Sequence, residues 1–330
     1  MSQLEKFNYD DIINNFNYPG NNDEPLDVFC GVMTGYNYEM ILPWVNSIEK
    51  SGFNGLKVII LYVAQSTTVQ KLINRGWLVL CFEKLNQQNL VVYNESGNNY
   101  NPPNYLTGKK FHICVDRFYH LWFFLSKLPS HIKKRCRYLT STDVRDIVFQ
   151  SNPFTWLSEN LDLNNTNKRI VAITESITYE NETTFSAMNL TDCYGSTMFE
   201  YMKKNLIYNA GTMAGEFNTM VDLFLQIYML SMGGNLKFLQ PDQAAYNILL
   251  SLSPFKDITL FIKSEDGWAA QLGTCWPHKQ FEGKIIEPFP ILDNNTQLLC
   301  TSKNKPFVIV HQYDRIPQLA AMFYNKYSTI

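Results

Sequence analysis

Short apolar runs alternate with amphipathic stretches through the first half of the chain. Three runs are mostly apolar and are bounded by glycine or polar residues, as strands buried on both faces of a parallel sheet are. They cover residues 27–34, 56–63 and 77–82. The stretches between them, 41–50 and 67–75, have helical spacing. This β-α-β-α-β order predicts a right-handed, doubly wound, mostly parallel α/β sheet flanked by helices.

The pattern continues toward the middle of the chain. An aromatic-rich helix is predicted over 111–128, and further strands over 136–142 and 169–175. The polar residues 84–109 are predicted to form a long surface loop, and the Thr-rich residues that follow the last strand, to about 195, a second loop. A strongly apolar helix is expected over 217–232. Residues 1–25 are polar, are broken by Pro19-Gly20, and are predicted to be an N-terminal arm. We expect residues 26–330 to form a single domain.

Composition narrows the classes of function. The chain has 330 residues and a formal net charge of −2, with no basic run that would attract nucleic acid or an anionic membrane. The first residues lack the apolar run of a signal peptide, and no apolar span is long enough to cross a bilayer. Seven cysteines, odd in number and never spaced as CxxC, argue against structural zinc and against a disulfide framework. We expect a cytoplasmic protein.

The most informative stretch is Arg135–Gln150, where a predicted strand leads into Asp143 and Asp146, with Arg145 between them. Open α/β sheets bind ligands at the carboxyl ends of their strands. Carboxylates are hard oxygen ligands that suit Mg²⁺ or Mn²⁺, with a diphosphate completing the shell. A surface turn whose acids pair with Arg145 and other bases explains the same residues, and the stretch alone does not decide.

Three stretches in the second half do not have the pattern of routine core. Residues 209–215 are small enough for close backbone approach, although a tight turn explains them too. Asp242 and Gln243 open a helix, where an acid also suits the helix dipole without any other role. Residues 306–315 form a strand that runs into a polar tail, with His311 at its carboxyl end, where a structural histidine is the plain alternative.

Taken in order, these stretches resemble the GT-A fold glycosyltransferases that use nucleotide sugars, in particular the glycogenin and lipooligosaccharide galactosyltransferase group. The resemblance extends over residues 27 to 315. It rests on a strand and aromatic turn, a helix with a basic residue, a DxD-like motif, an Asn-x-Gly stretch, an Asp-Gln stretch and a late histidine. The counterparts here are Thr34-Gly35-Tyr36, Arg117, Asp143, Asn209-Ala210-Gly211, Asp242-Gln243 and His311.

The chain departs from that family at two places. The family's second acid would fall at position 145, where this chain has Arg145, so Asp143 matches the first acid and Asp146 substitutes by chemistry rather than by register. Arg145 is the alternative, because its guanidinium can neutralise a diphosphate directly. The Lys-bearing motif after the family's histidine is missing, and Arg315 is the nearby cation.

The resemblance implies a Leloir-type glycosyltransferase that moves a sugar from a nucleotide-sugar donor, a UDP-sugar above all, to a glycan or protein-linked acceptor. Residues 26–150 would be the nucleotide-binding half, and residues 151–330 the sugar and acceptor half. Asp143, Asp146 and His311 would hold a divalent cation, Mn²⁺ in preference to Mg²⁺ because of the imidazole. Asp242 and Gln243 would be catalytic residues beside the sugar. Donor binding would fall to the residues Thr34, Gly35, Tyr36, Arg117, Asp143, Arg145, Asn209, Ala210 and Gly211.

Other functions stay open at this point. The same scaffold can serve as a nucleotide-sugar or glycan-binding protein without turnover. A nucleotidyltransferase would need a Gly-rich phosphate loop with a basic residue, and the turn after the first strand supplies none. Trp268, Trp276 and His278 are candidates for an acceptor platform, with core packing the alternative for at least one tryptophan. The sequence indicates neither the sugar nor the oligomeric state.

Overall fold

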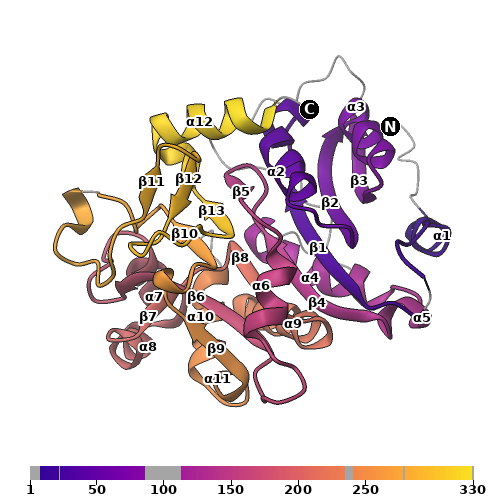
Figure 1. Cartoon of the computed structure of the whole chain (residues 1–330). Coiled ribbons are helices and arrows are strands. Elements are labelled where there is room, and N and C mark those ends of the chain that lie inside the picture. The colour runs from indigo at the N-terminus through magenta and orange to yellow at the C-terminus, as the bar shows by residue number, and fades with distance from the viewer. Residues whose placement is uncertain (1–7, 22, 86–112, 235–240, 278, 329–330) are drawn as a thin grey trace.

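The computed structural model describes residues 8–21, 23–85, 113–234, 241–277 and 279–328. Its centre is an eight-stranded, mostly parallel sheet (Figure 1). Seven of its strands are, in order of pairing, β3 (Leu78–Leu85), β2 (Leu56–Gln65), β1 (Leu26–Met33), β4 (Cys136–Thr142), β8 (Thr212–Glu216), β6 (Ile170–Thr178) and β7 (Leu206–Tyr208). The eighth, β9 (Thr259–Ile262), pairs with β6.

The four strands β3, β2, β1 and β4 are parallel, as predicted from their apolar runs. Beyond them β8 runs antiparallel to both β4 and β6, so β6 again points the same way as β4. The carboxyl ends of β1, β4 and β6 therefore lie on the same edge of the sheet. Parallel α/β sheets bind ligands at that edge.

Helices cover both faces of this sheet (Figure 1). One face packs on α2 (Tyr38–Lys50), α3 (Ser66–Asn74) and α6 (Pro153–Asn160) through residues such as Trp44 and Leu72. The other packs on α4 (Ile113–Ser126), α9 (Phe217–Gly233) and α10 (Asp242–Ser251), where Phe118 and Phe224 meet. Further short helices are α5 (Ser130–Lys133), α8 (Ser196–Met202) and α11 (Phe255–Ile258). Turns of 3₁₀ helix lie at Ser264–Asp266, Lys279–Phe281 and Tyr313–Arg315.

A second, three-stranded sheet stands beside the carboxyl edge of the main one. It consists of β10 (Ala269–Gln271), β13 (Ile309–His311) and β5 (Ile147–Phe149), with β13 parallel to β10 and antiparallel to β5. Because β5 follows β4 after a short turn, the two sheets meet at that turn. The hairpin of β11 (Ile291–Asp293) and β12 (Leu298–Cys300) and helix α12 (Pro317–Ser328) cover the small sheet, and α12 also packs on α2 (Figure 1).

Three parts of the chain differ from the sequence-based prediction. The segment predicted as a loop up to residue 195 contains the end of β6 and helix α7 (Ser186–Tyr194), whose first N–H groups are bonded by the Glu182 carboxylate. Strand β8 was missed because it is short and built from small residues. The predicted arm contains α1 (Tyr9–Asn14), in which Ile13 is buried and Tyr9 packs on Phe124.

Two remaining features complete the fold. Of the loop predicted over 84–109, residues 86–109 lie outside the described residues. The helices of the described part are all too short or too polar to cross a membrane. The division of the chain into an arm and one domain stays a prediction.

Candidate functional site

The turn between β4 and β5 carries the two acids that sequence analysis singled out. Asp143 follows the last residue of β4, and its backbone N–H donates to the Gly211 carbonyl at 2.9 Å, which ties the turn to the loop before β8. Asp146 precedes β5, and its carbonyl accepts from the backbone N–H of Gln312 at 2.7 Å. Each acid is thus held by a backbone bond to a distant segment. One of these segments precedes β8 of the main sheet, and the other follows β13 of the small sheet.

His311 reaches the same place from the small sheet. It is the last residue of β13, pairs in register with Ile147, and is 1% exposed. Its Nε2 lies 3.4 Å from Asp143 Oδ2 and 3.8 Å from Asp146 Oδ2. The three side chains offer ligand atoms that all lie within 4.8 Å of one another. We call Asp143, Asp146 and His311 the cation wall.

These residues fit a divalent cation. The Nε2 atom of His311 is buried and has no hydrogen-bond partner among the described residues. Two carboxylate oxygens and one imidazole nitrogen are a ligand set suited to Mn²⁺ or another first-row metal, with Mg²⁺ less favoured by nitrogen. A buried, unpartnered nitrogen that faces two carboxylates requires compensation, which either a proton or a metal ion supplies.

Gly211 leaves room for the cation wall. A Cβ atom built at this position would come 2.6 Å from Asp143 Oδ2 and 2.7 Å from the Cε1 of His311. Either contact is shorter than real Cβ contacts, so a larger residue at this position would displace Asp143 or His311. The small residue in the Asn-x-Gly stretch is therefore explained by this close approach.

Arg117 links the cation wall to the first turn of α10. Its guanidinium donates to Asp143 Oδ1 at 2.6 Å and to Asp242 Oδ2 at 2.9 Å, and its side chain is 17% exposed. Burial opposes ionisation of Asp143, but Arg117 and His311 outweigh burial and hold the pKa of Asp143 well below its usual range. Asp143 therefore stays ionised at neutral pH.

The other titratable groups of this region shift the opposite way. Burial raises the pKa of Asp146 and of Asp242, although His311 and Arg117 respectively oppose it. For His311, burial lowers the pKa, but the carboxylate of Asp143, 3.4 Å away, and the charge of Asp146 outweigh burial, and the net pKa is raised. The two acids therefore favour protonation of the His311 ring relative to an isolated imidazole.

A second group of polar side chains faces the cation wall across the cavity. Glu175, near the carboxyl end of β6, accepts through Oε1 from Asn209 Nδ2 at 2.7 Å and from Gln243 Nε2 at 3.1 Å. The carbonyl oxygens of these two amides accept in turn from the backbone N–H groups of Gly211 at 2.7 Å and Ala210 at 3.2 Å. We call Glu175, Asn209 and Gln243 the amide wall. Its bonds fix the 209–211 loop.

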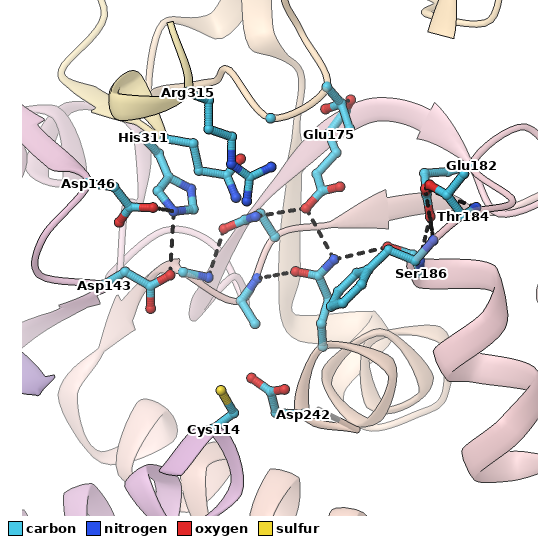
Figure 2. Close-up of a pocket in the computed structure, with 18 of the residues that line it drawn as sticks. Cys114, Asp143, Asp146, Glu175, Glu182, Thr184, Ser186, Asp242, His311 and Arg315 are labelled. Carbon is cyan, nitrogen blue, oxygen red and sulfur yellow. Dashed lines mark hydrogen bonds and ion pairs between the residues drawn. The ribbon is translucent and has the colours of Figure 1, made fainter. Parts of the chain in front are cut away.

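A cavity of about 580 Å³ lies between the two walls (Figure 2). Figure 2 shows His311 above the two aspartates, Arg315 beside it, Glu175 on the far side, and Asp242 with Cys114 below. Thr184 and Ser186, at the start of α7, line the end of the cavity beyond the amide wall. Cavities of this size and polarity accommodate small organic ligands.

Nine of the predicted site residues line this cavity: Arg117, Asp143, Asp146, Asn209, Ala210, Gly211, Asp242, Gln243 and His311. The other four do not line it. Thr34 and Gly35 lie at the carboxyl end of β1, with the Gly35 N–H bonded to Val63. Arg145 is paired with Asp314 at 2.6 Å, 5.8 Å from the centre of the Tyr36 ring. Their part in donor binding stays a prediction.

Core packing, given above for at least one tryptophan of the candidate acceptor platform, is confirmed for Trp268. Trp268 is 0% exposed and packs against Trp156 in the core, so it cannot stack on a ligand. Trp276 is partly buried against the core of the small sheet. His278 lies outside the described residues.

Sequence analysis missed three contributors to the site. Glu175 was assigned only as the end of a strand, and Ser186 fell in a segment predicted as a loop. Gln271 was not considered; it is buried in β10 and lies 2.6 Å from His311 Nδ1. An isolated Glu or Gln in a short strand carries no motif. The one available signal was a polar residue inside an apolar run, as in Ala269-Ala270-Gln271-Leu272.

No protein-family model matches the sequence, and no curated protein matches it. Among solved structures, the galactosyltransferase LgtC in complex with donor and acceptor sugar analogs is 9% identical, with a TM-score of 0.48, over 92% of this chain and 97% of that one. The glycosyltransferase GlyE of Streptococcus pneumoniae is 13% identical, with a TM-score of 0.49, over 93% and 61%. Mouse xyloside xylosyltransferase 1 is 14% identical, with a TM-score of 0.42, over 87% and 98%.

The chain spans only 46% of another match, the bifunctional glycosyltransferase WbbM, at 14% identity and a TM-score of 0.48. All of these similarities concern the path of the chain, and no residue's role is taken from them. The chain's own mixed α/β architecture, with a central, mostly parallel sheet flanked by helices, agrees with the prediction.

Proposed function

We propose that this chain is a glycosyltransferase that moves a sugar from a nucleoside diphosphate donor to a hydroxyl acceptor. The observation that carries the proposal is the cation wall: two carboxylates and one buried imidazole nitrogen, with ligand atoms within 4.8 Å of one another, at the carboxyl edge of a parallel sheet. A polar cavity of about 580 Å³ adjoins it, which suits a small polar ligand such as a sugar.

Asp143, Asp146 and His311 would hold a divalent cation, with Mn²⁺ the ion we expect. When bound, such an ion supplies positive charge that stabilises a departing diphosphate. Arg315 lines the same cavity and forms no ion pair within the part of the chain that the structure describes. Its guanidinium is therefore free to donate to phosphate oxygens, a role for which its forked geometry is suited.

The amide wall and Asp242 would bind the sugar. Asp242 keeps a fixed carboxylate orientation because Arg117 holds one of its oxygens. The Gln243 amide is already bonded to Glu175 and to the Ala210 N–H, so we assign it to shaping the sugar pocket rather than to attack on the anomeric carbon. In the transfer, the acceptor oxygen would form a bond to the anomeric carbon while the bond from that carbon to the diphosphate oxygen breaks. The electron pair of the broken bond would leave with the nucleoside diphosphate, and the acceptor proton would pass to solvent.

A donor screen tests the proposal. Purified protein is heated with a panel of nucleotide sugars, each with Mn²⁺ or with EDTA, and nucleoside diphosphate release is measured in parallel. We expect a UDP-sugar to raise the melting temperature only with Mn²⁺ and to be hydrolysed slowly without acceptor. Stabilisation with no release over long incubation would instead indicate a binding protein, and no stabilisation by any donor would contradict the proposal. A cytoplasmic location stays a prediction.

A further inference from the structure

The second ring nitrogen of His311 has a partner that the proposed reaction does not use. Nδ1 lies 2.6 Å from Oε1 of Gln271. The two residues are neighbours in register on the parallel strands β10 and β13, and each is 1% exposed. The pairing of β13 with β10 and with β5, together with this side-chain bond, thus fixes the orientation of the imidazole relative to Asp143 and Asp146.

The other end of the Gln271 amide is also bonded. Its Nε2 donates to the Thr212 hydroxyl oxygen at 2.7 Å, and Thr212 is the first residue of β8 in the main sheet. With the amide nitrogen directed to Thr212, the amide oxygen faces His311, and an oxygen there can only accept. Nδ1 must then carry the proton, and in the neutral ring the lone pair is on Nε2.

That lone pair points toward Asp143 and Asp146, at 3.4 Å and 3.8 Å. The reversed amide would donate to Nδ1 and move the ring proton to Nε2, where it would block a metal ion. The two orientations of one amide therefore correspond to a histidine that can bind a metal and to one that cannot.

We propose that Gln271, whose amide nitrogen is bonded to Thr212, is a positioning residue that fixes His311 in the Nδ1-protonated tautomer with Nε2 directed at the cation site. This inference rests on the proposed metal centre. Thr212 is the first residue of β8 and directly follows the 209–211 loop. The segment that carries this loop therefore also contacts the amide that binds the imidazole.

Mn²⁺ affinity, measured without donor by the electron paramagnetic resonance signal of the free ion, tests the proposal. Gln271→Leu has similar volume but no acceptor, and we expect its affinity to fall roughly 10- to 100-fold, as for other partners of metal-bound histidines. Gln271→Glu keeps an oxygen for Nδ1–H and should recover most of the loss. Gln150→Leu is the matched control, because Gln150 lies in the same layer but bonds only backbone groups of Leu299 and Phe307. It should stay within about twofold of wild type.

The tautomer itself gives a second measurement that needs no metal. In protein labelled with ¹⁵N-histidine, at alkaline pH where the ring is neutral, His311 should give the Nδ1–H pattern, and Gln271→Leu should lose it. An Nε2–H pattern in wild type, or equal Mn²⁺ affinity in wild type and Gln271→Leu, would overturn the proposal. Wild-type protein that binds no Mn²⁺ would overturn the metal centre, and the tautomer pattern would then decide the role of Gln271 by itself.

Discussion

The cation wall and the amide wall enclose the same cavity but differ in how their polar groups are paired. In the cation wall, Asp143, Asp146 and the Nε2 of His311 turn toward one another with no hydrogen bond between the imidazole and either acid. In the amide wall, Glu175 receives two amide donors, and each of those amides receives a backbone N–H. The cation wall leaves the buried His311 Nε2 without a hydrogen bond among the described residues, whereas these donors and acceptors of the amide wall are bonded within the protein.

The difference teaches which wall serves stability. A buried polar group whose bonds are complete contributes to the folded state, and removing one partner leaves the others unsatisfied at a cost. Groups that converge without pairing cost stability until a ligand joins them, as active sites commonly do. Substitutions in the cation wall should therefore reduce activity more than stability, whereas substitutions in the amide wall should reduce stability in addition to any loss of sugar binding.

The largest effect is expected for Asp143→Asn. The variant keeps the side-chain shape but loses a charged ligand, and we expect kcat/KM to fall by roughly 10³-fold, the scale found when transition-state charge loses its stabiliser. The melting temperature should change little, because Arg117 keeps Asp242 as a partner. Steady-state kinetics and thermal unfolding measure both. Asp27→Asn, which breaks an ion pair with Arg137 at the opposite edge of the sheet, is the control. If Asp143→Asn loses stability and keeps its activity, the acid is structural.

Glu175→Met tests the opposite wall. The side chain of Asn209 and that of Gln243 would each lose a buried acceptor, so we expect the free energy of unfolding to fall by about 2 kcal/mol. Glu175→Gln should restore most of this loss, because both amides bond to the same oxygen, Oε1, and an amide oxygen can replace it. Urea unfolding of the three proteins gives the comparison. Equal stability of Glu175→Met and wild type would show that the wall is not a stabilising unit.

The pH dependence of Mn²⁺ binding tests the role of His311 in the cation wall. A metal requires neutral His311, whose pKa is raised above its ordinary value of about 6.5 by the two acids. Affinity should therefore rise about tenfold per pH unit until the pH passes that raised pKa, then level off. Metal-free stability should move oppositely: the contribution of His311 is complete below about pH 6.5 and is lost as pH rises through its folded pKa. His311→Gln should abolish both trends, and a trend that survives this substitution belongs to another group.

The smallest effect is expected for Arg145→Ala. Arg145 is 46% exposed in its side chain and pairs with Asp314 on the surface, and such pairs contribute about 0–1 kcal/mol. Because it does not line the cavity, we expect kcat/KM to fall less than about threefold, whereas Arg315→Ala, inside the cavity, should lose about tenfold, roughly the value of one charge-assisted hydrogen bond. A larger loss for Arg145→Ala would return to Arg145 the diphosphate role that the sequence left open.

The parallel half of the fold was predictable because each strand is buried on both faces and so is a continuous apolar run. Residues 56–63, for example, fall within β2, where every position is buried except Lys57 and Gln65. The antiparallel additions were not predictable in this way. Strand β8 is Thr212–Glu216, with small residues and a glycine, and it is defined by its neighbours β4 and β6 rather than by its own composition.

The site was predictable where an acid or histidine stood at a strand end. Asp143 and His311 were found for that reason, and Asp146 by its chemistry. The position of Asp146 in the sequence does not show that this acid lies near the imidazole. The turn between β4 and β5 and the pairing of Ile147 with His311 bring Asp146 close to the ring. Glu175 and Gln271 were missed because their partners, which include Asn209, Gln243 and His311, lie far away along the chain, where no local pattern points to them.

The residues of the proposed cation site come from segments that are synthesised at different times. Both aspartates are synthesised well before His311 and its neighbour strand β10, and α12, which packs on α2, follows them. A growing chain can therefore form the parallel sheet early and still lack the imidazole and the amide that direct a cation. The proposed cation site would therefore be completed only after Glu175, Asn209 and Gln243 of the amide wall have been synthesised.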